Sequence, residues 1–241
     1  MDYFIELDTR AGAGDHVCLL SACREFIRRT GNTVYSENLP DVIAAYQAPN
    51  LRYGKKGIRF RISPKDLHRE GNPESLVNYY GTFLGAMGLL RDGEIPKLEL
   101  PKFDETEPRV VFQPYSVFAE NPPLEYLQGL VDSFREMTGM EVYAVGRTDT
   151  PQVLKNVEYS LLQDGVAHMM RVVQSASFVL APRSLLAHLA AGYGKSAFVW
   201  TPKDGENWHL NYSGWDRVLH SFKEGPATEV LRLFLKSHGM L

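Results

Sequence analysis

Cysteine is scarce in this chain of 241 residues, which contains only Cys18 and Cys23. The two lie five positions apart in a predicted helix, whereas neighbours on one helix face are three or four apart. They are therefore poorly placed to bridge each other, and a disulfide-stapled secreted scaffold is excluded. We expect two small buried side chains in a reducing compartment, in a chain long enough to fold without cross-links.

Long apolar runs and strong charge excess are also lacking. No stretch approaches the roughly 18 apolar residues that a membrane-spanning helix needs. The first six residues carry two acids and no basic residue, which is unlike a secretory signal. With 26 Lys and Arg against 29 Asp and Glu, the net charge is −3, which excludes histone-like and acidic disordered proteins. We expect a cytoplasmic globular protein.

Apolar segments alternate with amphipathic ones along the chain. Segments 3–7 and 33–36 flank a predicted helix over 16–29, and the alternation restarts at Arg109 after a stretch rich in proline and acids, 93–108. Strands alternating with helices at this spacing predict parallel sheets. The sequence therefore predicts an α/β protein with two domains, 1–100 and 101–241. A short helix is predicted over 150–156.

The first candidate site is the loop Ala11-Gly12-Ala13-Gly14-Asp15, between the first strand and the first helix. Glycines here let the backbone approach a ligand, and the helix amides behind them favour an anion. The pattern matches neither the dinucleotide fingerprint GxGxxG nor the phosphate loop of nucleotide hydrolases. Asp15 has two readings, a cap of the helix or a catalytic acid–base group.

The second candidate site follows a predicted buried strand and contains Arg183, Ser184 and His188. Ligands bind at the carboxyl ends of parallel strands. Arg183 and Ser184 would open the next helix and hold a phosphate with its free amides. His188 lies one turn beyond Ser184 on the same face, as a ligand contact or as a packed structural histidine.

A basic stretch interrupts this acidic protein. Residues 52–69 contain seven Lys or Arg residues and one acid, a local balance of +6. Such a stretch is either a solvated face or a site for an anionic partner. Nucleic acid is one such partner, with Tyr53 and Phe60 as the stacking side chains in this stretch.

Four motifs, in order and spacing, resemble glycosyltransferase family 9, which holds the lipopolysaccharide heptosyltransferases. They are Ala11–Val17, Val110–Ser116, Val142–Gly146 and Ser184–Lys195, within a similarity that spans about 3–200. The resemblance implies the GT-B architecture, two Rossmann-like domains with an interdomain cleft. It also implies a metal-independent enzyme whose donor substrate is a nucleotide-sugar, with no further cofactor.

The resemblance assigns roles to individual residues. Asp15 would be the general base that takes the proton of the acceptor hydroxyl. The residues implied for donor binding are Gly14, Ser116, Gly146, Asp149, Arg183, Ser184 and His188. In the acceptor domain, the basic stretch would bind an anionic acceptor through Arg52, Lys55, Lys56 and Arg59.

Two departures from the family pattern keep alternatives open. Residues 119–123 contain no Lys where the family has one, and Arg183 stands where the family has an acid. We expect a glycosyltransferase acting on a glycan or lipopolysaccharide-like acceptor. The alternatives are a transferase that modifies DNA bases and a non-catalytic member that binds a nucleotide or sugar. The sequence leaves the oligomeric state open.

Overall fold

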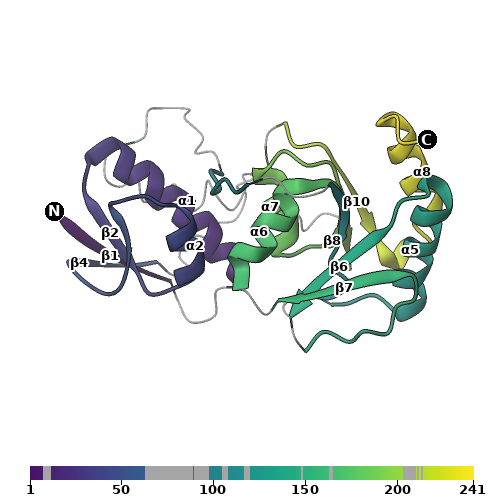
Figure 1. Ribbon diagram of the computed structural model, residues 1–241, viewed down its shortest axis with the longest axis horizontal. Coiled ribbons are helices and arrows are strands. Elements are labelled where there is room, and N and C mark those ends of the chain that lie inside the picture. Colours follow the sequence, from purple (N-terminus) through teal and green to yellow (C-terminus); the bar gives the residue numbers. More distant parts are fainter. Residues whose placement is uncertain are drawn as a thin grey trace. The chain divides into compact units, whose positions relative to one another are not determined.

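The computed structural model describes residues 1–7, 12–62, 89, 98–104, 108–116, 120–147, 149–162, 165–202, 210, 212 and 214–241. The chain divides into two compact units, each with its own sheet (Figure 1). Unit 1 comprises Met1–Phe103 and Trp208–Ser213, and unit 2 comprises Asp104–Asn207 and Gly214–Leu241.

The described residues of unit 1 form four parallel strands in the order β3-β2-β1-β4. The central strand β1 carries Phe4, Ile5 and Leu7, all less than 5% exposed, and its apolar side chains form the centre of the unit. The elements are β1 (Asp2–Leu7), α1 (Ala13–Thr30), β2 (Thr33–Ser36), α2 (Pro40–Ala45), β3 (Leu51–Tyr53) and β4 (Ile58–Ile62).

Helix α1 begins three residues before the predicted start. Gly14 and Asp15 therefore lie in its first turn, and the prediction that they belong to a loop is wrong. The carboxylate of Asp15 accepts a hydrogen bond from the backbone N–H of Gly12, at 2.8 Å. Because the first amides of a helix have no intrahelical partner, this bond stabilises the earlier start. The helix ends at Gly31, whose φ of 67° suits glycine.

The stretch predicted as a linker begins as part of unit 1. The backbone N–H of Glu99 donates to Ser21 Oγ at 2.7 Å, and the hydroxyl of Tyr46 donates to the carbonyl of Glu99 at 2.8 Å. Leu98 is buried. These contacts explain why unit 1 extends to Phe103, whereas the sequence placed the boundary at residue 100.

Unit 2 contains six parallel strands in the order β10-β9-β8-β5-β6-β7, which confirms the second parallel sheet. The strand β10 was not predicted, and residues 151–154 are not the predicted helix. The elements are β5 (Arg109–Phe112), α5 (Leu124–Thr138), β6 (Val142–Arg147), β7 (Val157–Leu162), α6 (Gly165–Ser175), β8 (Ala176–Pro182), α7 (Leu185–Gly192), β9 (Ala197–Thr201), β10 (Arg217–Ser221), the short 3-10 helix η2 (Phe222–Glu224) and α8 (Thr228–Ser237).

The helices of unit 2 cover both faces of its sheet. Figure 1 shows α6 and α7 on one face and α5 and α8 on the other. The large side chains Phe112, Phe178 and Trp200 pack with α5 and α8 in one core, and none of the three is more than 1% exposed. A parallel sheet buried on both faces presents its ligand-binding edge at the carboxyl ends of the strands.

Candidate functional site

The chain reverses direction across the sheet of unit 2 between β5 and β8. After β5 it continues through α5 to β6 on one side, and after β8 it continues through α7 to β9 on the other. The two strands are neighbours, with Phe112 opposite Leu180. Such a switch point opens a crevice between the loops that leave the two strands, which is where ligands bind in open α/β sheets.

The two loops at this switch point are joined by hydrogen bonds. Ser184 Oγ donates to Gln113 Oε1 at 2.8 Å, and Gln113 Nε2 donates to the carbonyl of Tyr115 at 2.8 Å. Ser116 follows directly, and its N–H donates to Asn121 Oδ1 at 2.7 Å. The structure therefore brings together Ser116 and Ser184, two residues that the sequence predicted for donor binding.

Ser184 is the N-cap residue of α7, but no side-chain hydrogen bond caps this helix. Arg183 precedes it and is partly exposed, with its backbone N–H bonded to the carbonyl of Trp200 at 3.2 Å. His188 lies one turn into α7 and is only 4% exposed. The described part of the site thus offers a cationic side chain and a helix start, which together suit an anion, while His188 belongs to the packed part of the helix.

Gly146 and Asp149 have local partners in the loop after β6. A Cβ at Gly146 would lie 2.4 Å from Thr150 Oγ1, so glycine is required for the turn to pack. The carboxylate of Asp149 accepts two hydrogen bonds from the guanidinium of Arg147, each at 3.0 Å. Both observations explain these residues by packing and pairing within the loop, and neither points to a nucleoside.

In unit 1, Asp15 lies at the start of α1, the helix that follows β1 and therefore opens at the carboxyl edge of that sheet. Its neighbour His16 was not singled out by the sequence analysis. Burial lowers the pKa of the His16 imidazole, and the negative charge of Asp15 opposes this shift only in part. A neutral imidazole therefore stands beside the carboxylate at neutral pH.

The second turn of α1 contacts a distant part of the chain. Tyr212 is buried in unit 1, and its hydroxyl lies 3.5 Å from the Sγ of Cys18, 194 positions away in sequence. Burial raises the pKa of the Cys18 thiol to about 12 and that of Tyr212 well above its ordinary value. We call residues 208–213, which belong to unit 1 between two segments of unit 2, the return segment.

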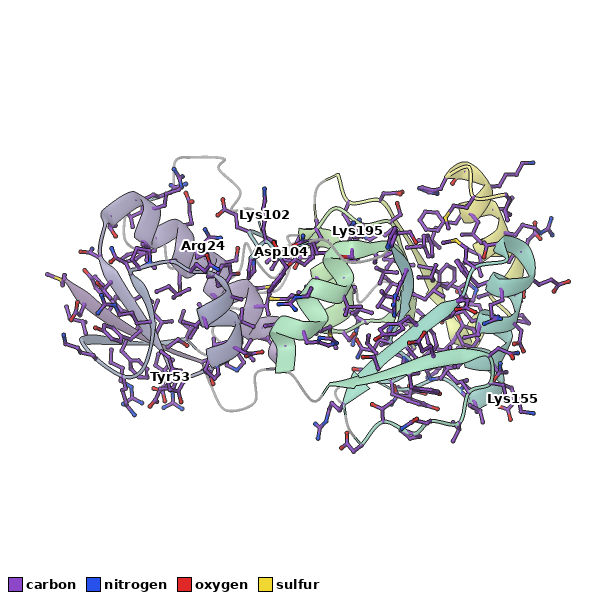
Figure 2. All side chains as sticks on the ribbon, in the orientation of Figure 1. Arg24, Tyr53, Lys102, Asp104, Lys155 and Lys195 are labelled. Atoms are coloured by element: carbon purple, nitrogen blue, oxygen red, sulfur yellow. The ribbon has the colours of Figure 1, made fainter. Side chains whose placement is uncertain are left out.

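The described part of the basic stretch crosses from β3 to β4 and is paired with acids. Lys56 Nζ lies 2.8 Å from Asp2, and Lys55 Nζ lies 3.8 Å from Glu37. Arg59 Nε donates to Glu6 at 2.7 Å, and Arg52 Nε donates to the carbonyl of Pro49 at 3.1 Å. Tyr53 lies on the surface of this unit, 60% exposed (Figure 2).

These cations lie at different levels of the sheet: Lys56 is near the start of β1, whereas Arg59 and Lys55 pair with Glu6 and Glu37 near its carboxyl edge. Residue Ile58, which begins β4, pairs with Tyr3 near the start of β1, and Lys56 reaches Asp2. Asp15 follows the other end of β1, and a six-residue strand separates its ends by about 16 Å. Lys65 and Arg69 lie outside the described residues.

Among the residues that the structure describes, no group of three or more His, Cys, Asp or Glu side chains is placed to hold a metal ion. In the same residues, no helix has the length and apolar character to cross a membrane.

Neither a protein-family profile nor a curated protein sequence matches the chain. Solved structures do match. E. coli heptosyltransferase WaaC with ADP superimposes with a TM-score of 0.70 at 11% identity, covering 98% of this chain and 99% of that one. The glycosyltransferase family 9 protein of Veillonella parvula DSM 2008 gives 0.68 at 9% identity, covering 98% and 89%.

A third match is the iron-containing dodecameric glycosyltransferase TibC of enterotoxigenic E. coli H10407, with a TM-score of 0.67 at 16% identity. The match covers 90% of this chain and spans 62% of the length of TibC. At such identities the likeness concerns the fold. It confirms, at the level of fold, the resemblance inferred from the four motifs: this chain shares the α/β fold of these solved glycosyltransferase structures.

Proposed function

We propose that this chain is a glycosyltransferase that moves a sugar from a nucleotide-activated donor to a hydroxyl of an anionic glycan or lipopolysaccharide-like acceptor. One observation carries the proposal. Ser184 and the loop of Ser116 are joined at the switch point of unit 2, where this fold binds ligands. Structures of the same fold have been solved with ADP and with ADP-heptose.

In the proposed reaction, the donor's diphosphate binds at the start of α7, beside Arg183 and Ser184. Asp15 takes the proton of the acceptor hydroxyl. The acceptor oxygen then forms a bond to the anomeric carbon as the bond from that carbon to the diphosphate breaks. Arg183 and the α7 amides stabilise the charge on the leaving diphosphate, so the proposal requires no metal ion.

The anionic nature of the acceptor is supported by the excess of cations on the β3–β4 crossover. Lys55, Lys56 and Arg59 pair with Glu37, Asp2 and Glu6, and the fourth cation, Arg52, donates to the carbonyl of Pro49. A phosphate or carboxylate of the acceptor would compete with these acids for the cationic side chains. DNA is anionic too, and duplex binding that weakens steeply with salt would favour it over a glycan.

A thermal-shift panel of nucleoside diphosphates and nucleotide-sugars tests the proposal. A ligand at about 100 times its dissociation constant adds roughly 2.7 kcal/mol to the free energy of unfolding. We expect at least one nucleotide-sugar to stabilise the protein and to be slowly hydrolysed, with release of its nucleoside diphosphate. A panel without any stabilising nucleotide would contradict the proposal.

A second candidate, a non-catalytic nucleotide- or sugar-binding protein, is favoured by the hydrogen bond from Gly12 to Asp15. This hydrogen bond gives the Asp15 carboxylate a structural role at the start of α1, which explains its presence without a role as a catalytic base. Stabilisation by a nucleotide-sugar without hydrolysis or transfer to any acceptor would support this second candidate.

A further inference from the structure

Gln113 occupies the switch point of unit 2, although its sequence position alone assigns it no role. It follows β5 directly, and its backbone N–H donates to the carbonyl of Leu180 on the neighbouring strand β8 at 2.9 Å. This bond extends the pairing of the two strands by one residue and places the side chain between the two diverging loops.

Both ends of the Gln113 carboxamide are used there. The oxygen accepts from Ser184 Oγ and the nitrogen donates to the carbonyl of Tyr115, each at 2.8 Å. Asn121 then holds the next residue from both sides, accepting from Ser116 N–H and donating to Ser116 O at 3.0 Å. One chain of hydrogen bonds therefore runs from Ser184 to Ser116, and Gln113 is the link that crosses between the loops.

The hydrogen bond to Gln113 also determines where the Ser184 hydroxyl points. Its backbone has the extended conformation of an N-cap residue, with φ −151° and ψ −172°. A serine in this position ordinarily turns its oxygen toward the amides of its own helix. Ser184 caps no amide of α7 with its side chain, and its hydroxyl is directed to Gln113 instead.

We propose that Gln113 is a positioning residue for the donor diphosphate. Its hydrogen bond holds the Ser184 hydroxyl away from the first amides of α7 and sets the spacing of the two loops between which the diphosphate binds. The inference rests on the proposed function. It adds to that function a residue that affects binding of the diphosphate and has no effect on binding of the nucleoside.

The test measures binding of ADP, adenosine and inorganic pyrophosphate by calorimetry to the full chain and to Gln113→Leu, which keeps the approximate size and removes both side-chain bonds. A hydrogen bond contributes about 1 kcal/mol net, which corresponds to about fivefold in affinity. We expect the variant to bind ADP and pyrophosphate about fivefold more weakly and to bind adenosine as the wild type does.

Gln128→Leu is a matched control. Gln128 also bridges two segments of unit 2 with both ends of its carboxamide, donating to the carbonyl of Lys155 at 3.2 Å and accepting from its N–H at 2.8 Å. It lies in α5, and its partner Lys155 precedes β7. We expect Gln128→Leu to lower the melting temperature as much as Gln113→Leu does and to leave ADP affinity within twofold.

A double-mutant cycle with Ser184→Ala tests whether Gln113 affects ADP binding through Ser184. If Gln113 acts through Ser184, adding Gln113→Leu to Ser184→Ala changes ADP affinity by less than twofold, because the partner is already gone. Full additivity, equal weakening of ADP and adenosine, or unchanged binding by Gln113→Leu would each overturn the positioning role. A wild-type protein that binds neither pyrophosphate nor any nucleoside diphosphate of the thermal-shift panel would refute the proposed function itself, and the inference with it.

Discussion

At the scale of single residues, Gly146 illustrates how packing explains a glycine that the family resemblance had assigned to the donor. A methyl group added at this position would lie 2.4 Å from Thr150 Oγ1 and 3.0 Å from two carbons of the same side chain. We expect Gly146→Ala to destabilise the protein by about 1–3 kcal/mol, which chemical denaturation measures.

The accompanying change Thr150→Ala removes Oγ1 and one of those carbons, so it should restore part of the lost stability to Gly146→Ala. ADP affinity, measured well below the melting temperature, should stay within twofold in both variants. A large loss of ADP affinity in a fully folded Gly146→Ala protein would show that this glycine contributes to donor binding.

Arg183 is the residue whose charge the proposed reaction needs most. We expect Arg183→Ala to weaken binding of ADP by about tenfold or more and to leave adenosine unaffected, because in the proposed site the guanidinium pairs with phosphate oxygens. Arg183→Lys should recover part of the affinity, since it keeps the charge and loses the planar fork. Equal weakening of ADP and adenosine in calorimetry would show that Arg183 does not act on the phosphates.

The sequence predicted Arg183 and Ser184 as ligand contacts because they follow a buried strand of a parallel sheet, and the resemblance to glycosyltransferase family 9 implied Ser116. It did not identify Gln113. A glutamine after a strand has no distinctive pattern, and its role depends on Ser184, 71 positions away. Lys55 and Lys56 were assigned to the acceptor from charge alone, and their pairing with acids on other strands appears only in the folded chain.

At the scale of elements, buried strands were predicted better than exposed ones. The strands β5, β8 and β9 are apolar runs covered on both faces, which is the pattern typical of parallel sheets. In contrast, β4 is the last described strand of its sheet, reads Ile-Arg-Phe-Arg-Ile and exposes Ile58. Its arginines were interpreted as part of a basic stretch, and its pairing with β1 was not predicted. The early start of α1 was missed because its N-cap residue, Gly12, has no side chain that signals a helix start, and Asp15 in the first turn bonds the Gly12 N–H instead.

The contact of α1 with the return segment predicts how stability depends on pH. Burial raises the pKa of the Cys18 thiol from 9.0 to about 12, so the folded state holds this proton more tightly than the unfolded state. The stabilising contribution is complete below about pH 9 and is lost as the pH rises toward 12. Each such group changes the free energy of unfolding by up to about 1.4 kcal/mol per pH unit.

We therefore expect the free energy of unfolding, from urea titrations at pH 8 and pH 10.5, to fall more steeply in the wild type than in Cys18→Ala. Replacing Tyr212 by Phe should flatten the same dependence, because burial raises the pKa of that hydroxyl too. Identical slopes in all three proteins would mean that water reaches Cys18 and Tyr212 in the folded protein.

At the scale of the whole molecule, the two parallel sheets were predictable and the path of the chain between them was not. The alternation of apolar and amphipathic segments restarts at Arg109, and this restart marks the second sheet. The return segment of unit 1 rests on contacts such as Tyr212 with Cys18, which no local pattern encodes. The division is therefore discontinuous, where the sequence suggested a single boundary.

The central claim, that the chain transfers a sugar with Asp15 as the base, is tested most directly by comparing Asp15→Asn with the wild type. Transfer from the nucleotide-sugar that stabilises the protein most is measured together with the affinity for that donor. Asparagine can still accept the hydrogen bond of Gly12, so stability should change by less than about 1 kcal/mol.

Because asparagine cannot take the acceptor proton, we predict that the transfer rate falls by about a hundredfold or more while the affinity for the donor stays within twofold. An unchanged transfer rate in Asp15→Asn would contradict the assignment of Asp15 as the base. Donor binding without transfer by the wild type would contradict the enzyme and favour the binding protein.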